Sequence, residues 1–389
     1  MTATLLLALV LAPVEVVETA PEGSGLGDAQ VADAIDVLPR LFNSARSSID
    51  LAQFYLLYYP PHSKGRDLCP LYDALIAAAQ RGVRVRIIVD SVTLEQSPTE
   101  TYHRMPRELG SVPGIEVRSV DLRPHSDYAG CLMHAKYCLI DGAVALVGSH
   151  NWSFGAFRDN REISVVVRDS AYAAELGEVF DADWRSAGNP NDETRMTKPG
   201  PRTRPLVPRP SPLVPGPRLV VTSPAGLRDS GQLSTAAALA TVCAAAESTL
   251  DVEVNSISDR VEFGKGKRFG LVESLLASTA RRGVGVRLLV DKWALEHDAA
   301  LVRKLDSVPN LSVRVIDITR AGPNPGAGTM HSKLVIADRR LAMVGSATLS
   351  QRQVLECRNV GAVIADSAAI STLARLFERD WFSTYAREP

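Results

Sequence analysis

An internal repeat constrains the fold of this chain more than any other feature of its sequence. Several segments of the first half recur, in the same order, in the second half. The matched segments have the same length and the same spacing of apolar residues. RGVRVRIIVD (from Arg81) matches RGVGVRLLVD (from Arg282), SVPGIEVRSVDL (from Ser111) matches SVPNLSVRVIDI (from Ser307), and FDADW (from Phe180) matches FERDW (from Phe377). So many ordered matches indicate a tandem duplication, in which each half folds as one copy of the same unit.

Each half has the pattern of an α/β unit. The apolar run at 87–89 has the composition of a buried strand, and the segment 71–80 that precedes it has a helical pattern. The chain has 389 residues, which is more than one ordinary core can organise. Because strand and helix patterns alternate, we predict two tandem α/β domains, each a mixed β-sheet flanked by helices.

Proline marks the boundary between the two halves. The segment 187–218 contains the run PGPRTRPLVPRPSPLVPGPR. Proline fixes φ and removes a backbone donor, so this segment is predicted to be an extended, semi-rigid linker. The predicted organisation is an apolar N-terminal segment at 1–13, a first domain at 14–186, the linker at 187–218 and a second domain at 219–389.

The apolar N-terminal segment, with its run LLLALVLA, lacks the features of a membrane anchor. It is too short to cross a bilayer as a helix. No Lys or Arg precedes it, whereas an export signal begins with a positively charged region. We therefore expect no transmembrane segment, and we favour a cytoplasmic location over export.

Composition describes a soluble globular protein, with 46% hydrophobic and 22% charged residues. The formal net charge of −1 gives no overall field that would attract a polyanion, so any attraction of phosphate must come from a local cluster. The five cysteines are sparse and lack the spacing of a zinc site. A disulfide such as Cys69 with Cys131 is left open by the sequence.

The part of the repeat that carries chemistry is MHAKYCLIDGAVALVGSHN, which begins at Met133 and returns in the second half as MHSKLVIADRRLAMVGSAT. Side chains two apart on a strand project from the same face, so His134 and Lys136 form a pair. The following Asp-Gly predicts a tight hairpin turn, and the return strand ends in Gly-Ser near the pair. His331 and Lys333 form the same pair in the second copy.

Two imidazole–ammonium pairs suit the cleavage of a phosphodiester. A neutral imidazole is a nucleophile at physiological pH, and a second, protonated imidazole can give its proton to the leaving oxygen. The ammonium groups of Lys136 and Lys333, with the amide of Asn151, would neutralise the non-bridging oxygens. Neither copy contains the carboxylate cluster of a two-metal nuclease. We therefore expect a metal-independent phosphodiesterase that needs no cofactor and works through a covalent phosphohistidine.

The repeated motif resembles the HKD pattern of the phospholipase D superfamily. The first copy fits as His134-x-Lys136-x4-Asp141-x6-Gly148-Ser149-x-Asn151, and the second as His331-x-Lys333-x4-Asp338-x6-Gly345-Ser346. The resemblance covers nearly the whole chain after Val14. It implies two phospholipase D-like domains related by a pseudo-twofold axis, with both motifs at one site in the groove between them. The stretches VETAPEG, DLAQFYL and VRLLVDKW look like the endolysosomal-type members, which degrade single-stranded nucleic acid from its 5′ end.

The second copy departs from the family pattern at two positions. Family members carry an acidic residue after the Asn of the motif, where it orients the catalytic imidazole. Glu162 stands there in the first half, but Asn359 stands at the aligned position of the second half, and Thr348 replaces the expected Asn of the second motif. We therefore predict that Glu162 supports His134, that His134 attacks phosphorus and that His331 protonates the leaving group.

Four further residues of the motif have structural interpretations. Asp141 and Asp338 are predicted to hold the hairpin turns, which is also the role that the resemblance implies. Ser149 and Ser346 either donate to the phosphate or close the turn at the end of the return strand, and they are included among the predicted substrate-binding residues.

Two tryptophans and one threonine complete the predicted substrate-binding set. Trp152 directly follows the first motif, and Trp293 follows a central strand. Each could stack on a base or on a lipid head group, but core packing is the favoured interpretation for both. Thr348 joins the set because of its place in the second motif.

The sequence thus predicts an enzyme that hydrolyses a phosphodiester or transfers it to an alcohol, with phospholipid and single-stranded nucleic acid as the two candidate substrates. The alternative is a catalytically impaired phosphate-binding or scaffold protein of the same fold, as Thr348 and Asn359 suggest. Because both His–Lys pairs persist, the enzyme is favoured. One chain supplies both halves, so we expect a monomer without an obligate protein partner.

Overall fold

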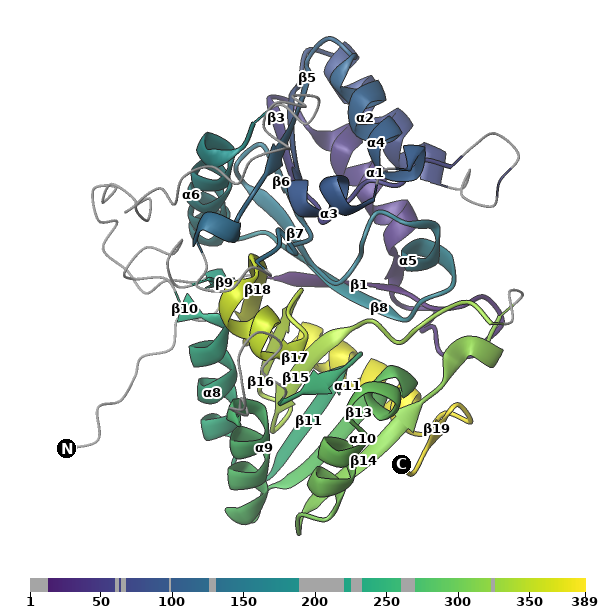
Figure 1. Cartoon of the computed structure of the whole chain (residues 1–389), viewed down its shortest axis with the longest axis vertical. Helices are drawn as coiled ribbons and strands as arrows, with labels where there is room; N and C mark the ends of the chain where they lie inside the picture. The colour runs from purple at the N-terminus through teal and green to yellow at the C-terminus, as the bar shows by residue number, and fades with distance from the viewer. Residues whose placement is uncertain are drawn as a thin grey trace, which may run out of the picture.

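The computed structural model describes residues 13–59, 63, 68–97, 99–125, 131–188, 220–224, 233–259, 270–322 and 326–389. The predicted N-terminal segment (1–13) lies, apart from its last residue, outside these described residues, and so does most of the predicted linker (187–218). The boundaries of both segments therefore stay predictions. The two halves of the chain form two lobes, one above the other in Figure 1, and each lobe is built on a mixed β-sheet.

The first lobe alternates strands and helices as the sequence predicts. Its strands are β1 (Val14–Thr19), β2 (Ala32–Asp33), β3 (Ser48–Ala52), β4 (Arg84–Asp90), β5 (Ile115–Val120), β6 (Tyr137–Ile140), β7 (Val144–Gly148) and β8 (Glu162–Val167). Its helices are α1 (Ala34–Ser44), α2 (Cys69–Gln80), α3 (Ser91–Gln96), α4 (Glu100–Gly110), α5 (Phe154–Arg158) and α6 (Ser170–Ser186). Helix α1 begins where the Asp33 carboxylate accepts the backbone N–H of Ile35, which satisfies one of the donors at the helix end.

The second lobe repeats these elements. Its strands are β9 (Val220–Ser223), β10 (Leu233–Ser234), β11 (Thr249–Val254), β12 (Ile257–Ser258), β13 (Gly285–Asp291), β14 (Leu311–Ile316), β15 (Lys333–Ala337), β16 (Leu341–Gly345), β17 (Leu349–Ser350), β18 (Asn359–Ile364) and β19 (Ala386–Arg387). Its helices are α8 (Thr235–Ala245), α9 (Leu271–Arg281), α10 (Lys292–Asp306) and α11 (Ser367–Trp381), and a π-helical turn spans Arg352–Glu356.

The two sheets have the same strand order, which confirms the duplication. The first sheet runs β2-β1-β8-β7-β6-β3-β4-β5, and the second runs β10-β9-β18-β16-β15-β11-β13-β14, with β19 added at its edge. The register is also the same, because Asp50 faces Arg86 in the first sheet and Asp251 faces Arg287 in the second. Each of these pairs forms a two-pronged ion pair whose shorter contact is 2.7 Å.

A hydrophobic core runs through both lobes. Helices α1 and α2 cover the outer side of the first sheet, and α8 and α9 cover that of the second (Figure 1). Between the sheets, apolar side chains of both halves form one buried cluster, which includes Ile163, Phe180, Leu334 and Phe377. The two lobes are therefore packed directly against each other and do not depend on the linker alone to stay together.

Two buried arginines connect the lobes in a pseudo-symmetric way. Arg161, directly before β8, donates to Asp380 of α11 at 2.7 Å and also to Glu18. Arg358, directly before β18, donates to Asp183 of α6 at 2.7 Å. All four charged partners of these cross-lobe pairs are essentially inaccessible to solvent. Because an unpaired buried charge is costly, these pairs specify how the lobes dock.

Two further predictions concern membranes and cysteines. In the described ranges, no helix combines the length and the apolar character that a membrane span requires. The thiols of Cys69 and Cys131 are both free, the first exposed and the second buried, so the disulfide that the sequence left open is not formed.

Candidate active site

The two motif strands meet at the interface between the lobes. The residue before each motif histidine forms an isolated bridge with the opposite half, Met133 with Arg358 and Met330 with Arg161. The backbone N–H of His134 then donates to the carbonyl of Arg358 at 2.9 Å, and that of His331 donates to the carbonyl of Arg161 at 2.8 Å. Each histidine is thus held in place by the lobe to which it does not belong.

Two aspartates that the sequence reasoning missed also hold these segments. Asp90, the last residue of β4, accepts the N–H of Met133 at 2.7 Å, and Asp291, the last residue of β13, accepts the N–H of Met330 at 2.8 Å. Both carboxylates also cap the helix that follows their strand. An identical Asp at the end of both copies of a buried strand was the available signal.

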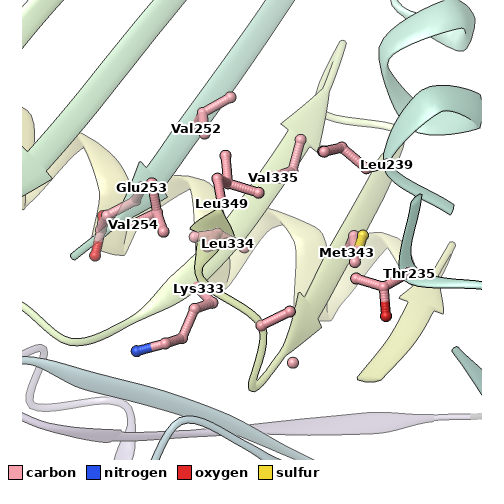
Figure 2. A pocket seen from close by; sticks show the side chains of 12 residues that line it. Thr235, Leu239, Val252, Glu253, Val254, Lys333, Leu334, Val335, Met343 and Leu349 are labelled. Carbon is pink, nitrogen blue, oxygen red and sulfur yellow. The ribbon is translucent and has the colours of Figure 1, made fainter. Parts of the chain in front are cut away.

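The lysine of each motif lies beside its own histidine. Lys136 Nζ donates to the carbonyl of His134 at 2.5 Å, and Lys333 Nζ donates to the carbonyl of His331. Figure 2 shows that the Lys333 side chain lines an apolar pocket of the second lobe with its nitrogen pointing away from the apolar side chains. Burial in these surroundings lowers the pKa of Lys333 to about 7, although Glu162 opposes the shift.

Glu162 contacts the histidine of the second motif. Its carboxylate accepts from His331 Nδ1 at 2.8 Å, and Glu162 is fully buried. The prediction that Glu162 supports His134 was therefore wrong, because β8 presents its first residue across the interface to the opposite motif. Burial opposes ionisation of Glu162, but the nearby His331 outweighs it and holds the pKa of the carboxyl at about 2.

Asn359 takes the equivalent position beside His134. Its Oδ1 accepts from His134 Nδ1 at 3.2 Å and from Ser346 Oγ at 2.8 Å, while its Nδ2 donates to the carbonyl of Gln353 at 2.6 Å. The second lobe therefore still supplies an orienting group, because the neutral amide of Asn359 holds the ring of His134. The first lobe supplies a carboxylate to His331 at the equivalent position.

The charged groups of the two motifs affect each other's ionisation. Burial lowers the pKa of His134 well below its usual range, and the charges of Lys136, Lys333 and His331 lower it further. The pKa of His331 is also lowered, first by burial, while Glu162 counteracts the shift. A bound anion would offset the repulsion among these positive groups and would therefore raise the pKa of both histidines and both lysines.

The motif serines are structural. Ser149 Oγ donates to the carbonyl of Ile163 at 3.1 Å and accepts the N–H of the same residue at 3.0 Å. Ser346 Oγ makes the equivalent bond with the N–H of Val360 at 3.1 Å and also holds Asn359. Both side chains are fully buried, so the structure corrects the prediction that they bind substrate.

The motif aspartates hold turns, as predicted. Asp141 and Asp338 both adopt a positive φ at the hairpin. The Asp141 carboxylate accepts the backbone N–H groups of three successive residues, 46–48, and Asp338 accepts those of 247–249. Burial raises the pKa of Asp141, but these donors outweigh it and lower the pKa to about 2.

The two candidate tryptophans have opposite environments. Trp152 has no exposed surface and packs edge-on against Tyr72 at a centroid distance of 5.3 Å, so the prediction that it binds substrate was wrong and core packing is confirmed. Trp293 is 52% exposed and stacks on His297 at 4.5 Å, so core packing was wrong for this residue. Its backbone N–H donates to Asp291, which also holds Met330 next to His331.

The remaining two predicted residues are both buried. Asn151 is 8% exposed, and within the described part of the chain its Oδ1 has no hydrogen-bond partner. Thr348, also 8% exposed, donates through Oγ1 to Asn255 Oδ1 at 3.2 Å. The sequence reasoning missed Asn255, and it also missed Phe54, whose ring lies 5.1 Å from that of His134.

Comparison with families of known proteins agrees with this arrangement. Residues 38–184 and 243–381 match a family model described as cardiolipin synthase, PLD-like domain. The two matched ranges cover the two lobes separately, so the family unit occurs twice in this chain.

Several curated proteins are similar over most of the chain. Phospholipase D Z of Dictyostelium discoideum is 25% identical over 380 residues, which cover 90% of this chain and 85% of that protein. The 5'-3' exonuclease PLD3 of Homo sapiens is 24% identical over 403 residues, with 96% and 80% covered. A probable phospholipase D of Caenorhabditis elegans is 23% identical over 343 residues, and this chain spans 60% of its length.

Among solved structures, phosphatidylserine synthase of Haemophilus influenzae has the same fold. The TM-score is 0.71, and the match covers 98% of this chain and 89% of the synthase. Only 12% of the aligned residues are identical, so this likeness concerns the architecture of the two lobes and not their substrates.

Proposed function

Because the chain belongs to the phospholipase D-like family of phosphodiesterases, we propose that it hydrolyses single-stranded nucleic acid through a phosphohistidine formed on His331. The observation that carries this proposal is the pair of cross-lobe contacts, His331 with Glu162 and His134 with Asn359. Both contacts engage Nδ1, so Nε2 is the atom of each ring that is left for chemistry.

In the first step, His331 is the nucleophile. With Nδ1–H donated to the Glu162 carboxylate, the ring holds the tautomer whose Nε2 carries a lone pair. The pKa of His134 is low in the free protein, but the negative charge of the bound phosphate favours the protonated ring. Nε2 of His331 forms a bond to phosphorus, the bond between phosphorus and the leaving oxygen breaks, and His134 Nε2 gives that oxygen its proton. Glu162 stabilises the positive charge that the phosphorylated ring acquires, an advantage that the neutral Asn359 does not offer to His134. This reverses the roles predicted from the sequence, since those roles followed from the wrong pairing of Glu162.

In the second step, His134 acts as the base. Its Nε2, now without the proton, takes a proton from a water molecule whose oxygen attacks phosphorus. The bond between phosphorus and His331 breaks, which releases the phosphate product and restores both rings to their starting states. An alcohol in place of water would give a transfer product through the same step.

The two lysines supply the charge that stabilises the transition state in this proposal. Lys136 and Lys333 are buried next to the two rings; burial lowers the pKa of both, and a bound phosphate anion favours their charged forms, which then stabilise the developing negative charge. Asn151 adds an amide donor from the end of the first motif. These three groups do not require a metal ion, so turnover is expected to persist in EDTA.

The aromatic side chains around the site favour nucleic acid as the substrate. Trp293 presents an exposed ring, and its backbone is held by Asp291, which also holds Met330 next to His331. The ring of Phe54 lies against that of His134. Tyr55, the next residue, meets the edge of Tyr102 at a centroid distance of 5.6 Å. Bases stack on such rings with little regard to sequence, while the lysines meet the phosphates. In the described residues, the large hydrophobic side chains that are exposed are Trp293 and Phe382, which do not form a broad apolar rim.

The named relatives support two substrate classes. Among the similar proteins, several are named 5'-3' exonucleases, and these support the degradation of nucleic acid from its 5′ end. Phospholipase D Z supports phospholipid as the second candidate. An impaired phosphate-binding protein is the third, although Asn359 now has a structural explanation that does not require loss of activity.

The proposal is tested by incubating the purified full chain in EDTA with a 5′-phosphorylated single-stranded oligonucleotide, and separately with phosphatidylcholine vesicles. We expect successive release of nucleotides from the 5′ end and no release of choline. Choline release without nucleotide release would replace the proposed substrate by phospholipid. If neither product forms, the phosphate-binding alternative takes the place of the enzyme.

A further inference from the structure

The second motif lacks the amide that the first motif carries. Asn151 ends the first GSxN, whereas Thr348 stands at the same position in the second. The Thr348 hydroxyl does not point into the site as a spare donor, because it is engaged with Asn255 Oδ1 at 3.2 Å. This contact places a carboxamide directly beside the position where the motif has lost one.

The residue of the first lobe that is equivalent to Asn255 indicates which groups lie next to this position. Val254, the last residue of β11, pairs with Lys333, so Asn255 follows directly after the strand that flanks the second motif. By the same register, the equivalent residue of the first lobe is Phe54, which follows β3. The ring of Phe54 lies 5.1 Å from that of His134, and Lys136 Nζ lies 5.4 Å from its centroid.

The amide therefore stands at a different position in each lobe. The first lobe has Phe54 at the strand end and Asn151 in the motif, whereas the second has Asn255 at the strand end and Thr348 in the motif. Because Thr348 anchors Oδ1, the end of the amide that remains is Nδ2, which carries two N–H donors. The described residues supply no acceptor for it.

We propose that Asn255 binds a non-bridging oxygen of the substrate phosphate through Nδ2, and so replaces in the second lobe the amide that Asn151 provides in the first. Thr348 is then a positioning residue that orients this amide. This inference rests on the proposed phosphodiesterase function, since it assigns one more donor to the same phosphate. It also explains how the second motif keeps a working site without its own Asn.

The experiment compares three variants of the full chain, Asn255→Ala, Thr348→Asn and the double variant, with Asn151→Ala as the matched loss of the first amide. The probe is bis(4-nitrophenyl) phosphate, which has neither a base nor a lipid tail. Removal of one donor to an oxyanion costs about 100-fold or more in kcat, so we expect N255A and N151A to fall by about that factor. Thr348→Asn in the N255A background restores an amide from the motif side and should recover most of the loss.

Wild-type turnover by N255A, or a loss in N255A that T348N does not reverse, would overturn the inference. Binding of inorganic phosphate, measured by calorimetry, provides a second readout, with weaker binding by N255A than by the wild type. If the wild-type chain binds phosphate but does not turn over the probe, the proposed hydrolysis fails. The phosphate affinity of N255A still tests the role of Asn255 in that case, and wild-type affinity contradicts it.

Discussion

Glu162 of the first lobe holds His331 of the second lobe at 2.8 Å, from Oε2 to Nδ1. The pseudo-symmetric contact, between Asn359 and His134, has an amide in place of the carboxylate. The site is thus symmetric in position and asymmetric in charge, and the two histidines are therefore not equivalent. The asymmetry can be tested from both sides, by removing the carboxylate from one ring and by adding one to the other.

Replacing Glu162 by Gln is expected to lower kcat strongly while the fold is retained. The amide can still contact His331 Nδ1, but it cannot stabilise a positive ring, and a loss of this kind reaches about 10⁴-fold in a serine-protease triad. Steady-state kinetics with bis(4-nitrophenyl) phosphate measure the loss. Asn359→Asp is the matched variant, and its carboxylate should raise the pKa of His134 and shift the pH optimum upward. Equal kinetic effects of the two variants would contradict the asymmetry.

Separate replacement of the two histidines is expected to divide the reaction into its steps. A 4-nitrophenolate leaving group needs little help from an acid, so His134→Ala should still form the phosphohistidine and release about one equivalent of 4-nitrophenol per chain in a rapid burst. Slow turnover follows, because the base for water is missing. His331→Ala should give no burst. Rapid-quench measurement and mass spectrometry of the trapped chain check this, and a burst in H331A with none in H134A would exchange the two roles.

How much the sequence revealed depended on whether a feature is local. The His–Lys pairs, the turn aspartates and the alternation of strands and helices follow from spacing within each copy, and the structure confirms the duplication and the turns. The contact of Glu162 with His331 could not be read from spacing, because it joins two halves whose relative placement is set by packing. The same limit applies to Trp152 and Trp293, since burial of one and exposure of the other are decided by neighbours that are distant in sequence.

The ionisation of the two buried lysines is expected to set the alkaline limit of activity in the free protein. Burial lowers the pKa of Lys333 to about 7 and lowers that of Lys136 well below its usual range, so these ammonium groups lose their protons, and their charge, as the pH rises. The value of kcat/KM, which reports the free enzyme, should therefore fall above about pH 7. In kcat the same limb should lie at higher pH, because a bound phosphate anion favours the charged form. A kcat/KM that stays constant from pH 6 to 9 would contradict this assignment.

The buried carboxylates near Arg161 are expected to make stability depend on pH. Glu253 Oε2 and Asp380 Oδ1 have no donor in the described part of the chain, and burial raises the pKa of both groups, so they are expected to share a proton. A raised pKa in the folded state means that the wild type loses stability as the pH rises above the ordinary value of 4.5 for Glu253. In the Glu253→Gln variant, the side-chain amide can still donate a hydrogen bond to Asp380, but it has no proton that is lost as the pH rises.

The E253Q variant should therefore resemble the wild type near pH 4 and become the more stable of the two as the pH rises. Urea unfolding across this range measures the difference in the free energy of unfolding. A stability difference between E253Q and the wild type that is the same at every pH would argue against a shared proton.

Trp293→Ala is expected to weaken the use of oligonucleotides without affecting the chemistry. Stacking of one base on an aromatic ring contributes about 1–3 kcal/mol, so KM for a single-stranded oligonucleotide should rise by about tenfold or more, while the kinetics with bis(4-nitrophenyl) phosphate stay unchanged. Phe382 is the matched control, because it is also exposed, at 67%, but follows α11 and not a strand end beside a motif. If F382A and W293A behave alike, or if W293A also slows the small substrate, then the exposed ring of Trp293 is not a base-binding platform.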